Sequence, residues 1–420
     1  MTKQKNKKSI QVCAHWQGLA EPALMGTIYA TPIRGKEVFS FEYTPTWLKS
    51  PYAQTLDPDL GLFSGAQYTR DDKDNFGLFL DSSPDRWGRL LMQRREAQQA
   101  RTEKREVRPL LESDYLLGVY DGHRMGALRF RLGDDQPFLD DKTSMASPPW
   151  VRLRELEDAS LQLENDNAEK NKNYSKWLNM LIAPGGSLGG ARPKAGVVDE
   201  DGGLWIAKFP SKRDETNIGA WEFIVHQLAH KAGVDVSSAK IQRFSGTHDT
   251  FLTRRFDRSD AGERIHFASA MTLLGKKDGE EGSYLDIAEF IIRGGAKVSQ
   301  DLEQLWRRIV FNICVSNTDD HLRNHGFLLT SKGWILSPAY DMNPVPTGDG
   351  LVLNISKNDN AQSLELALSV APYFRLKKTR AEAIISEVRK AVKPWQKLAK
   401  KIGLPERETA TIRRAFRAVE

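Results

Sequence analysis

An apolar run that leads directly into a cluster of polar residues constrains the fold of this chain more than any other feature. The run Ile309–Val315 is almost entirely aliphatic or aromatic and contains Cys314, so we expect a helix that begins near Leu305 and carries a buried thiol. The next residues, Asn317–Asn324, read Asn-Thr-Asp-Asp-His-Leu-Arg-Asn. The sequence therefore predicts a polar loop at the end of an apolar helix.

The spacing inside this loop indicates a specific chemistry. Asp319 and Asn324 are five positions apart, the separation of the acidic base and the metal-binding amide in the kinase catalytic loop H-R-D-x-x-x-x-N. A carboxylate can orient and deprotonate an incoming hydroxyl, and an amide oxygen can hold Mg²⁺ beside phosphates. Taken alone, the same spacing also fits a capped loop in a structural protein.

A second carboxylate follows a predicted hairpin. Gly326–Leu329 and Trp334–Leu336 are strand-like, and Asp341 comes shortly after them. We expect Asp341 to be a second Mg²⁺ ligand, the role of the Asp of D-F-G in protein kinases. Met342-Asn343 stand where Phe-Gly would, which departs from the ordinary kinase pattern.

Phosphate-binding groups are predicted upstream. Lys208 lies on the predicted strand Leu204–Phe209, where Ile206-Ala207-Lys208 resembles the kinase V-A-I-K strand, and Glu222 in the apolar-periodic stretch 218–231 is its candidate partner. The glycine-rich run Gly185–Lys194 can aim backbone N–H groups at phosphates. Each signal has an ordinary alternative: a surface lysine, an exposed helical glutamate and a turn.

In these motifs the chain resembles the HipA family, bacterial toxin kinases that are paired with a DNA-binding antitoxin. Four matching stretches appear in the family order, and Leu80–Gly88 resembles the family's N-terminal subdomain, so the resemblance covers the whole chain. The four stretches are Ser187–Ala195, Arg255–Arg258, Asn317–Asn324 and Ala339–Pro344.

The resemblance implies a fold and a division of the chain. It implies an α+β, protein-kinase-like two-lobed fold, with a mixed N-terminal part that includes a small sheet and a mainly helical C-terminal lobe. We expect an N-terminal HipA-type subdomain over 1–140, a kinase N-lobe over 141–258 and a helical C-lobe over 259–420. ATP and Mg²⁺ are the implied cofactors.

The resemblance also assigns roles. It makes Asp319 the base, places Asn324 and Asp341 on the metal, and makes Ser187 the site of an inactivating autophosphorylation; Glu222 and Asp257 are supporting residues. The implied nucleotide-binding residues are Leu188, Gly189, Gly190, Ala191, Arg192, Pro193, Lys194, Lys208, Arg254, Arg255, Phe256, His321, Arg323, Asn324, Tyr340 and Asp341.

The implied activity is that of an ATP-dependent serine/threonine protein kinase that acts as the toxin of a toxin–antitoxin pair. Its implied target is a protein of the translation machinery such as an aminoacyl-tRNA synthetase, with growth arrest as the result. The implied partner is a helix-turn-helix antitoxin, and operator DNA would be contacted only through that complex. Two alternatives remain: a catalytically silent corepressor subunit and a small-molecule kinase.

Composition agrees with phosphate-bearing partners and a reducing compartment. The formal net charge is +6, and there are only two cysteines, Cys13 and Cys314, which argues against a disulfide framework. The basic N-terminus lacks an apolar signal segment, and no stretch approaches the roughly 20 apolar residues of a membrane span. We therefore expect a cytoplasmic protein without membrane contact.

Two local structures are predicted from patterns alone. Short alternating runs from Ile10 to Phe41 indicate a small sheet. A helix should start at Pro84 with Ser83 as its cap and Asp85 in its first turn. The His pairs 226/230 and 321/325 have the four-residue spacing of zinc ligands but lack a third ligand, so surface or hydrogen-bonding roles are favoured.

Overall fold

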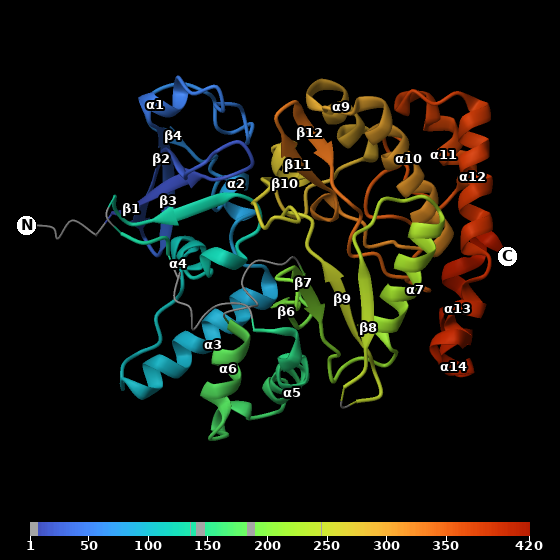
Figure 1. The fold of residues 1–420 in the computed structure, drawn as a ribbon, viewed down its shortest axis with the longest axis horizontal. Helices are drawn as coiled ribbons and strands as arrows, with labels where there is room; N and C mark the ends of the chain where they lie inside the picture. The colour runs from blue at the N-terminus through green and yellow to red at the C-terminus, as the bar shows by residue number, and fades with distance from the viewer. Residues whose placement is uncertain (1–6, 135, 140–147, 183–189, 245) are drawn as a thin grey trace, which may run out of the picture. The chain divides into compact units, whose positions relative to one another are not determined.

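The computed structural model describes residues 7–134, 136–139, 148–182, 190–244 and 246–420 (Figure 1). The chain forms two compact units. Unit 1 comprises residues up to 212 together with 257–268 and 275–277; unit 2 comprises 213–256, 269–274 and 278–420. The three-part division expected from the sequence, with boundaries near 140 and 258, stays a prediction.

Unit 1 contains an antiparallel five-stranded sheet in the order β4-β3-β2-β1-β5. In β2 and β5 buried side chains alternate with more exposed ones, so one face of the sheet can join a core. That core is aromatic: Phe79 on α2 packs between Phe41 and Phe130, with ring centroids 5.4 and 6.1 Å away. The small sheet expected between Ile10 and Phe41 is confirmed. The strands are β1 (Lys8–Ala14), β2 (Ala23–Ile33), β3 (Lys36–Tyr43), β4 (Gln67–Tyr68) and β5 (Leu128–Arg131).

Helices α1 to α4 of unit 1 lie between β3 and β5 in the chain, and α5 and α6 follow β5; α3 and α5 both pack against α6 (Figure 1). A hairpin of β6 (Lys194–Val198) and β7 (Leu204–Lys208) completes the unit, and β7 confirms the predicted strand. The helices are α1 (Pro45–Leu48), α2 (Gly77–Leu80), α3 (Arg86–Thr102), α4 (Glu112–Leu117), α5 (Leu153–Leu163) and α6 (Tyr174–Ile182).

The start of α3 differs from the prediction. Asp85, not Ser83, is the N-cap, because its carboxylate accepts a hydrogen bond from the Gly88 N–H at 2.7 Å. Ser83 is already engaged, since its hydroxyl donates to the Phe79 carbonyl at 2.8 Å. Pro84 consequently stands before the helix rather than at its first position.

A buried ion-pair cluster stabilises unit 1. The carboxylate of Asp121 accepts hydrogen bonds from Arg129 at 2.7 Å and from Arg264 at 3.1 Å. Burial alone would raise the pKa of Asp121, but the guanidinium groups of Arg264, Arg129 and Arg124 outweigh it and lower the pKa. The ionised carboxylate is therefore part of the folded state.

Unit 2 is mainly helical and is built around α10 (Val298–Val315), which packs on α9, α11 and α12 (Figure 1). The buried residues of α10 include Trp306, Phe311 and Cys314, as expected for an apolar helix. Burial raises the pKa of the Cys314 thiol to about 12. The other helices are α7 (Ile218–Lys231), α8 (Ala270–Leu273), α9 (Tyr284–Gly294), α11 (Leu364–Val370), α12 (Lys378–Val392), α13 (Trp395–Ile402) and α14 (Glu406–Ile412).

Two antiparallel hairpins accompany these helices. One pairs β8 (Ala239–Gln242) with β9 (Thr250–Arg254), and the other pairs β11 (Gly326–Thr330) with β12 (Gly333–Leu336), as predicted. A short strand, β10 (Phe267–Ser269), stands where the chain passes from unit 1 to unit 2.

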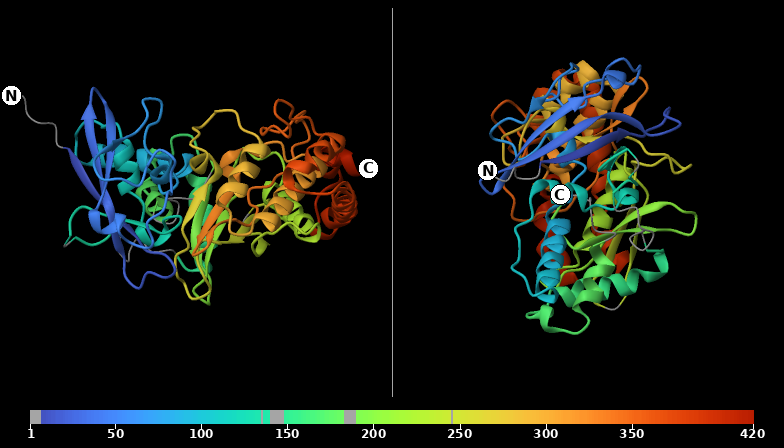
Figure 2. Two further views of the ribbon diagram at one scale, coloured as in Figure 1. Left: turned by 90° about the horizontal axis from the view of Figure 1, so that it is seen from above. Right: turned by 90° about the vertical axis from the view of Figure 1, so that its left-hand side faces the viewer.

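The C-terminal helices cover α7, whose bounds match the predicted helical stretch. The Trp395 ring stacks on Phe416 at 4.2 Å and lies 6.1 Å from Trp221 of α7. The carboxylate of Glu408 accepts hydrogen bonds from the Trp221 indole at 2.6 Å and from the Asn217 N–H at 2.8 Å. Figure 2 shows these helices, coloured red, from two further directions.

The predicted α+β fold class is confirmed by these small antiparallel sheets and their helices. Both cysteines are buried free thiols, so no disulfide contributes to the fold. Across the residues that the structure describes, no helix combines the length and apolarity needed to cross a membrane.

Candidate active site

The end of α10 sets the position of the predicted catalytic loop. The helix stops at Ser316, which adopts a left-handed conformation with φ of 49° and donates its N–H to the Asn312 carbonyl. The Asn317 N–H also donates to that carbonyl, at 3.0 Å. The reversal directs the chain away from the helix axis into residues 317–325 and then into β11.

Within this loop Asp319 is exposed between buried neighbours. Asn324 is only 7% exposed, and its side-chain N–H donates to the Asp319 carbonyl at 3.1 Å. This bond uses the amide nitrogen of Asn324 and leaves the amide oxygen as the atom that could hold a cation. The backbone thus links the predicted base and the predicted metal-binding amide.

The carboxylate of Asp320 anchors the loop to the helices around it. Its Oδ2 accepts hydrogen bonds from the Tyr284 hydroxyl at 2.6 Å, from Asn312 at 2.8 Å and from His325 at 2.8 Å. Burial would raise the pKa of Asp320, but the interaction with His325 and the hydrogen bond from Tyr284 lower it. The same carboxylate, together with burial, raises the pKa of Tyr284. The buried, ionised carboxylate of Asp320 therefore holds the loop in place, while the neighbouring Asp319 is exposed.

Three hydrogen bonds join the loop to the second predicted motif. The Tyr340 hydroxyl donates to the Arg323 carbonyl at 2.6 Å, and the Asn343 N–H donates to the Asn317 side-chain oxygen at 3.1 Å. The third bond runs from the Val345 N–H to the Ser316 carbonyl at 3.0 Å. The structure thus brings the segment 340–345 against the loop 316–325. The two segments are separated in the sequence by the hairpin β11–β12.

Asp341 has an unusual backbone conformation. Its φ is 58°, a left-handed value that costs an aspartate conformational energy unless its surroundings hold it there. The segment before it is fixed by a bond from the Ala339 N–H to the Asp235 carbonyl at 2.7 Å. A fully buried guanidinium, that of Arg308 on α10, donates to the Ser337 carbonyl, and burial lowers the pKa of Arg308 to about 10.

Further predicted nucleotide-binding residues of unit 2 flank this site. The Phe256 ring lies 5.5 Å from the Tyr340 ring, so the end of β9 reaches the second motif. Arg255 is only 5% exposed, and Arg254 ends β9, with its N–H donating to the Ser238 carbonyl at 2.9 Å. The loop itself supplies the remaining residues: His321 is half-buried, and the side chain of Arg323 pairs with Asp278.

The remaining predicted residues belong to unit 1 or lie outside the described residues. Lys208 ends β7 and is 9% exposed, while Lys194 begins β6 and forms a 2.8 Å ion pair with Asp85. Asp257 is fully buried and accepts hydrogen bonds from the Gly126 N–H and from Arg258. Gly190, Ala191, Arg192 and Pro193 lead into β6, whereas Ser187, Leu188 and Gly189 are outside the described residues.

The expected pairing of Glu222 with Lys208 stays a prediction. Glu222 is on α7 in unit 2 and is 3% exposed, whereas Lys208 is in unit 1.

The HipA-like C-terminal domain family matches residues 186–395, half of the chain. The chain belongs to the HipA-like family. This match includes the predicted catalytic loop 317–324 and the segment 339–344, which is hydrogen-bonded to it.

Two relatives of this HipA-like chain carry kinase names. "Putative kinase Y4dM" of Sinorhizobium fredii is 28% identical over 182 residues, which cover 39% of this chain and 44% of the relative. "Putative kinase" of Haemophilus influenzae is 26% identical over 179 residues, which cover 37% of this chain and 52% of the relative. The chain thus spans about half the length of the curated relatives that it matches.

A solved structure shares the fold over nearly the whole chain. It is that of the Shewanella oneidensis toxin–antitoxin system, a complex of HipA, HipB and operator DNA. The TM-score is 0.63 at 16% identity, with 99% of this chain and 96% of the other chain covered. At this identity the likeness establishes the HipA fold alone.

The donor set of the HipA-like site fits Mg²⁺ held jointly with phosphates. Mg²⁺ prefers oxygen ligands and is usually held by one or two protein groups plus substrate phosphates and water. Asn324 and Asp341 offer an amide and a carboxylate oxygen, and the buried side-chain oxygen of Asn343 has no hydrogen-bond partner. The described residues contain no cluster of three or more His, Cys, Asp or Glu suited to a metal.

The sequence missed the residues that hold the loop in place. Asn312, which holds the loop, and Arg308, which holds the segment before Asp341, are polar residues inside an apolar helix, and that position was the available signal, because buried polar groups need partners. Tyr284 and Asp320 gave no comparable signal, since their contact joins positions 36 residues apart.

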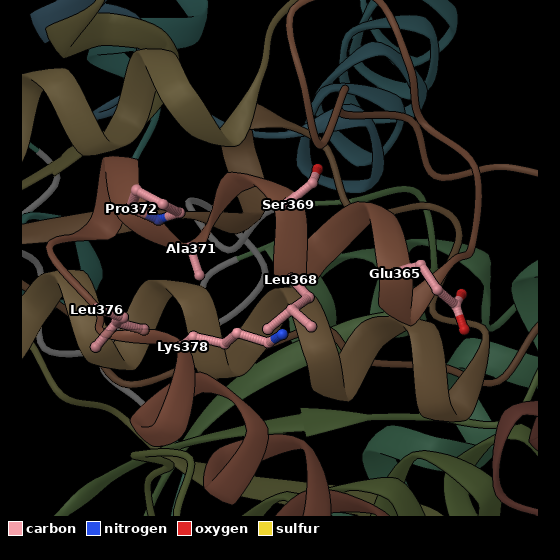
Figure 3. A pocket seen from close by; sticks show the side chains of 7 residues that line it. All are labelled: Glu365, Leu368, Ser369, Ala371, Pro372, Leu376 and Lys378. Atoms are coloured by element: carbon pink, nitrogen blue, oxygen red, sulfur yellow. The ribbon is translucent and has the colours of Figure 1, made fainter.

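A pocket of about 420 Å³ lies elsewhere in unit 2 (Figure 3). It is formed by α11, the following turn and the start of α12, and its lining contains none of the predicted site residues. Its lining residues are Glu365, Leu368, Ser369, Ala371, Pro372, Leu376 and Lys378.

Proposed function

We propose that this chain is an ATP-dependent protein kinase that transfers the γ-phosphoryl group to a serine or threonine hydroxyl. One observation carries the proposal: in a HipA-like fold, the loop bearing Asp319 and Asn324 is hydrogen-bonded to the segment bearing Asp341. This arrangement supports a single reaction centre for a base and two metal-holding side chains.

In the proposed reaction Asp319 accepts the proton of the substrate hydroxyl, whose oxygen forms a bond to the γ-phosphorus. The bond from that phosphorus to the β,γ-bridging oxygen breaks, and ADP leaves. Asn324 and Asp341 would hold Mg²⁺, which when bound neutralises charge on the phosphates. The exposure of Asp319 suits a base that must reach a hydroxyl on another protein, or on another segment of this one.

The biological role is proposed from the family. The Shewanella oneidensis HipA was solved with HipB and operator DNA. By analogy we propose that this chain is a toxin that binds a helix-turn-helix antitoxin and meets operator DNA only through it. The further proposals are phosphorylation of a translation protein such as an aminoacyl-tRNA synthetase, growth arrest, silencing by phosphorylation at Ser187, and action in the cytoplasm, where ATP is available.

The test is transfer of label from γ-labelled ATP in the presence of Mg²⁺. Wild-type protein should label itself or proteins in an extract, and Asp341→Asn should remove the labelling. Asp349→Asn is the matched control, because Asp349 is an exposed aspartate in the same unit whose side chain makes a surface contact with Arg414. Labelling of a metabolite alone would favour a small-molecule kinase, and no labelling by wild type would favour the silent corepressor.

A further inference from the structure

A segment of unit 2 that contains Val352 runs beside the predicted catalytic loop and is hydrogen-bonded to it. The Val352 N–H donates to the Thr318 carbonyl at 2.9 Å, and Thr318 directly precedes Asp319. Two residues further on, the Asn354 carbonyl accepts the N–H of Tyr284, the first residue of α9, at 3.0 Å. The segment is therefore fixed next to the proposed base.

Burial alternates along this segment. Leu351, Leu353 and Ile355 are at most 2% exposed, whereas Val352 is 54% exposed. The backbone of Leu351 is held on both of its polar atoms: its N–H donates to the Asn360 carbonyl at 2.9 Å, and its carbonyl accepts the Asn360 side-chain N–H at 2.6 Å. Because its buried neighbours are anchored in unit 2, the exposed side chain of Val352 stands at a fixed place.

A glycine lets the start of the same segment approach the loop. A Cβ atom at Gly348 would lie 2.4 Å from the Thr318 side chain, so only glycine fits there without a shift. The Gly348 carbonyl accepts hydrogen bonds from the side chains of Gln362 at 2.8 Å and Arg417 at 3.3 Å. The segment thus meets Thr318 twice, at its side chain through Gly348 and at its carbonyl through Val352.

The position of Val352 distinguishes it from other exposed apolar side chains, which occur singly on most protein surfaces. Unit 2 exposes three large hydrophobic side chains among the residues described, those of Val352, Ile292 and Tyr373. Of these three, Val352 is the one whose backbone is hydrogen-bonded to the predicted catalytic loop. Paired backbones lie about 5 Å apart and consecutive Cα atoms about 3.8 Å apart, so Val352 stands within about 10 Å of Asp319, the reach of about three extended residues.

We propose that Val352 is a specificity-determining residue, and that it selects protein substrates with an aliphatic residue within three positions of the phosphorylated serine or threonine. The inference rests on the proposed function, since it concerns the same reaction centre. A chain whose hydroxyl reaches Asp319 can lie over Val352 with the residues that flank the hydroxyl. An aliphatic side chain there removes apolar surface from water on both partners, whereas a charged one loses hydration without gaining a partner.

The test is phosphorylation of a peptide library with γ-labelled ATP and Mg²⁺. Each peptide contains one serine and one varied residue among the three positions on either side of it. At one of these positions wild-type protein should prefer Leu, Ile or Val to Glu or Lys by about fivefold in kcat/KM, the effect of burying about half of an aliphatic side chain. Labelling of the enzyme itself is measured in the same reactions.

Two substitutions of Val352 should change this preference at the same peptide position. Val352→Glu should favour Lys over Leu by about threefold, the range of an exposed ion pair. Val352→Thr keeps the shape of the side chain and should reduce the aliphatic preference to about twofold or less. Partial unfolding cannot produce either result, because it lowers the phosphorylation of all peptides alike.

Ile292→Glu is the matched control. Ile292 is an exposed aliphatic residue of α9 in the same unit, so this variant adds the same charge away from the predicted catalytic loop. It should keep the wild-type preference at every varied position.

The possible failures of the inference and of the proposed function are distinguishable. Wild-type protein that phosphorylates peptides without an aliphatic preference, or labels itself but no peptide, would overturn the inference alone. The same conclusion would follow if Val352→Thr kept the full wild-type preference, or if Ile292→Glu changed it as Val352→Glu does. Wild-type protein that labels neither itself nor any peptide would remove the proposed function and the inference with it.

Discussion

Two adjacent aspartates in the predicted catalytic loop should respond to the same substitution in different ways: one variant should lose activity and the other stability. Asp319 is exposed, while Asp320 is buried and accepts three hydrogen bonds on a single oxygen. We expect Asp319→Asn to lower phosphorylation by at least about 100-fold, the range for loss of a general base, and to change the free energy of unfolding by no more than about 0.5 kcal/mol.

The cost of Asp320→Asn follows from its three bonds. Hydrogen bonds to a charged group contribute about 1.5–3 kcal/mol each, against about 1 kcal/mol for neutral ones. The amide oxygen can still accept all three bonds, so only the difference is lost, which amounts to about 3 kcal/mol in total. For a unit of about 190 residues this lowers the melting temperature by roughly 6–12 °C.

The assay measures both quantities on both variants. Phosphorylation is followed with γ-labelled ATP at a temperature below every transition, and stability is followed by circular dichroism during heating and in urea. If Asp320→Asn melts like wild type but has lost phosphorylation, and Asp319→Asn remains active, then the base has been assigned to the wrong carboxylate.

Three other substitutions or reagents test the structure of the two units. Asp121→Asn removes the carboxylate that pairs with two arginines, so urea unfolding at neutral pH should show a free energy of unfolding about 3 kcal/mol below that of wild type. Because the pKa of Asp121 is lowered in the fold, this difference between variant and wild type should shrink as the pH falls below the ordinary aspartate pKa of about 4. A difference that stays constant with pH would contradict the ion pair. Gly219→Ala should cost about 1–3 kcal/mol in thermal unfolding, because the new Cβ would lie 2.0 Å from the Asp249 carbonyl, whereas Gly246→Ala, where the nearest atom is 3.9 Å away, should have little effect. Cys314 should not react with a chromogenic thiol reagent until urea unfolds unit 2, since its pKa is about 12 and its side chain is buried; rapid labelling of the folded protein at this position would show that the core opens there.

Sequence periodicity was sufficient where a segment has one buried face. The predicted stretch 218–231 is α7 itself, and the predicted strand 204–209 is β7 with one residue fewer. In both cases local propensity and burial favour the same structure, so the pattern needs no knowledge of the rest of the chain.

Local rules failed where residues compete for one task. Ser83 and Asp85 are both good helix caps, and we predicted Ser83 because Pro84 would then occupy the first position of the helix. In the structure Ser83 donates to the preceding helix, and Asp85 caps α3 while also pairing with Lys194, 109 positions away. Only the tertiary fold reveals that second partner, so the choice of cap could not be made from local sequence.

The candidate site shows the same division between local and tertiary information. The spacing of Asp319 and Asn324 was readable because a single loop carries both residues. The hydrogen bonds that hold that loop could not be predicted from the sequence, because they join Tyr284 of α9, Asn312 of α10 and Asp320 of the loop. Their contact depends on how the helices of unit 2 pack.

Two residues of the site with left-handed backbone conformations indicate why these hydrogen bonds are needed. Ser316 and Asp341 both have φ near 50–60°, a conformation that non-glycine residues adopt only when surrounding contacts hold them. The Val345 N–H donates a hydrogen bond to the Ser316 carbonyl. The hydroxyl of Tyr340, beside Asp341, donates one to the Arg323 carbonyl of the predicted catalytic loop. Each strained residue is thus held by the segment that carries the other. A change that breaks this mutual support, even without touching Asp319, should therefore reduce phosphorylation by displacing Asp319 and Asp341 relative to each other, because both turns relax together.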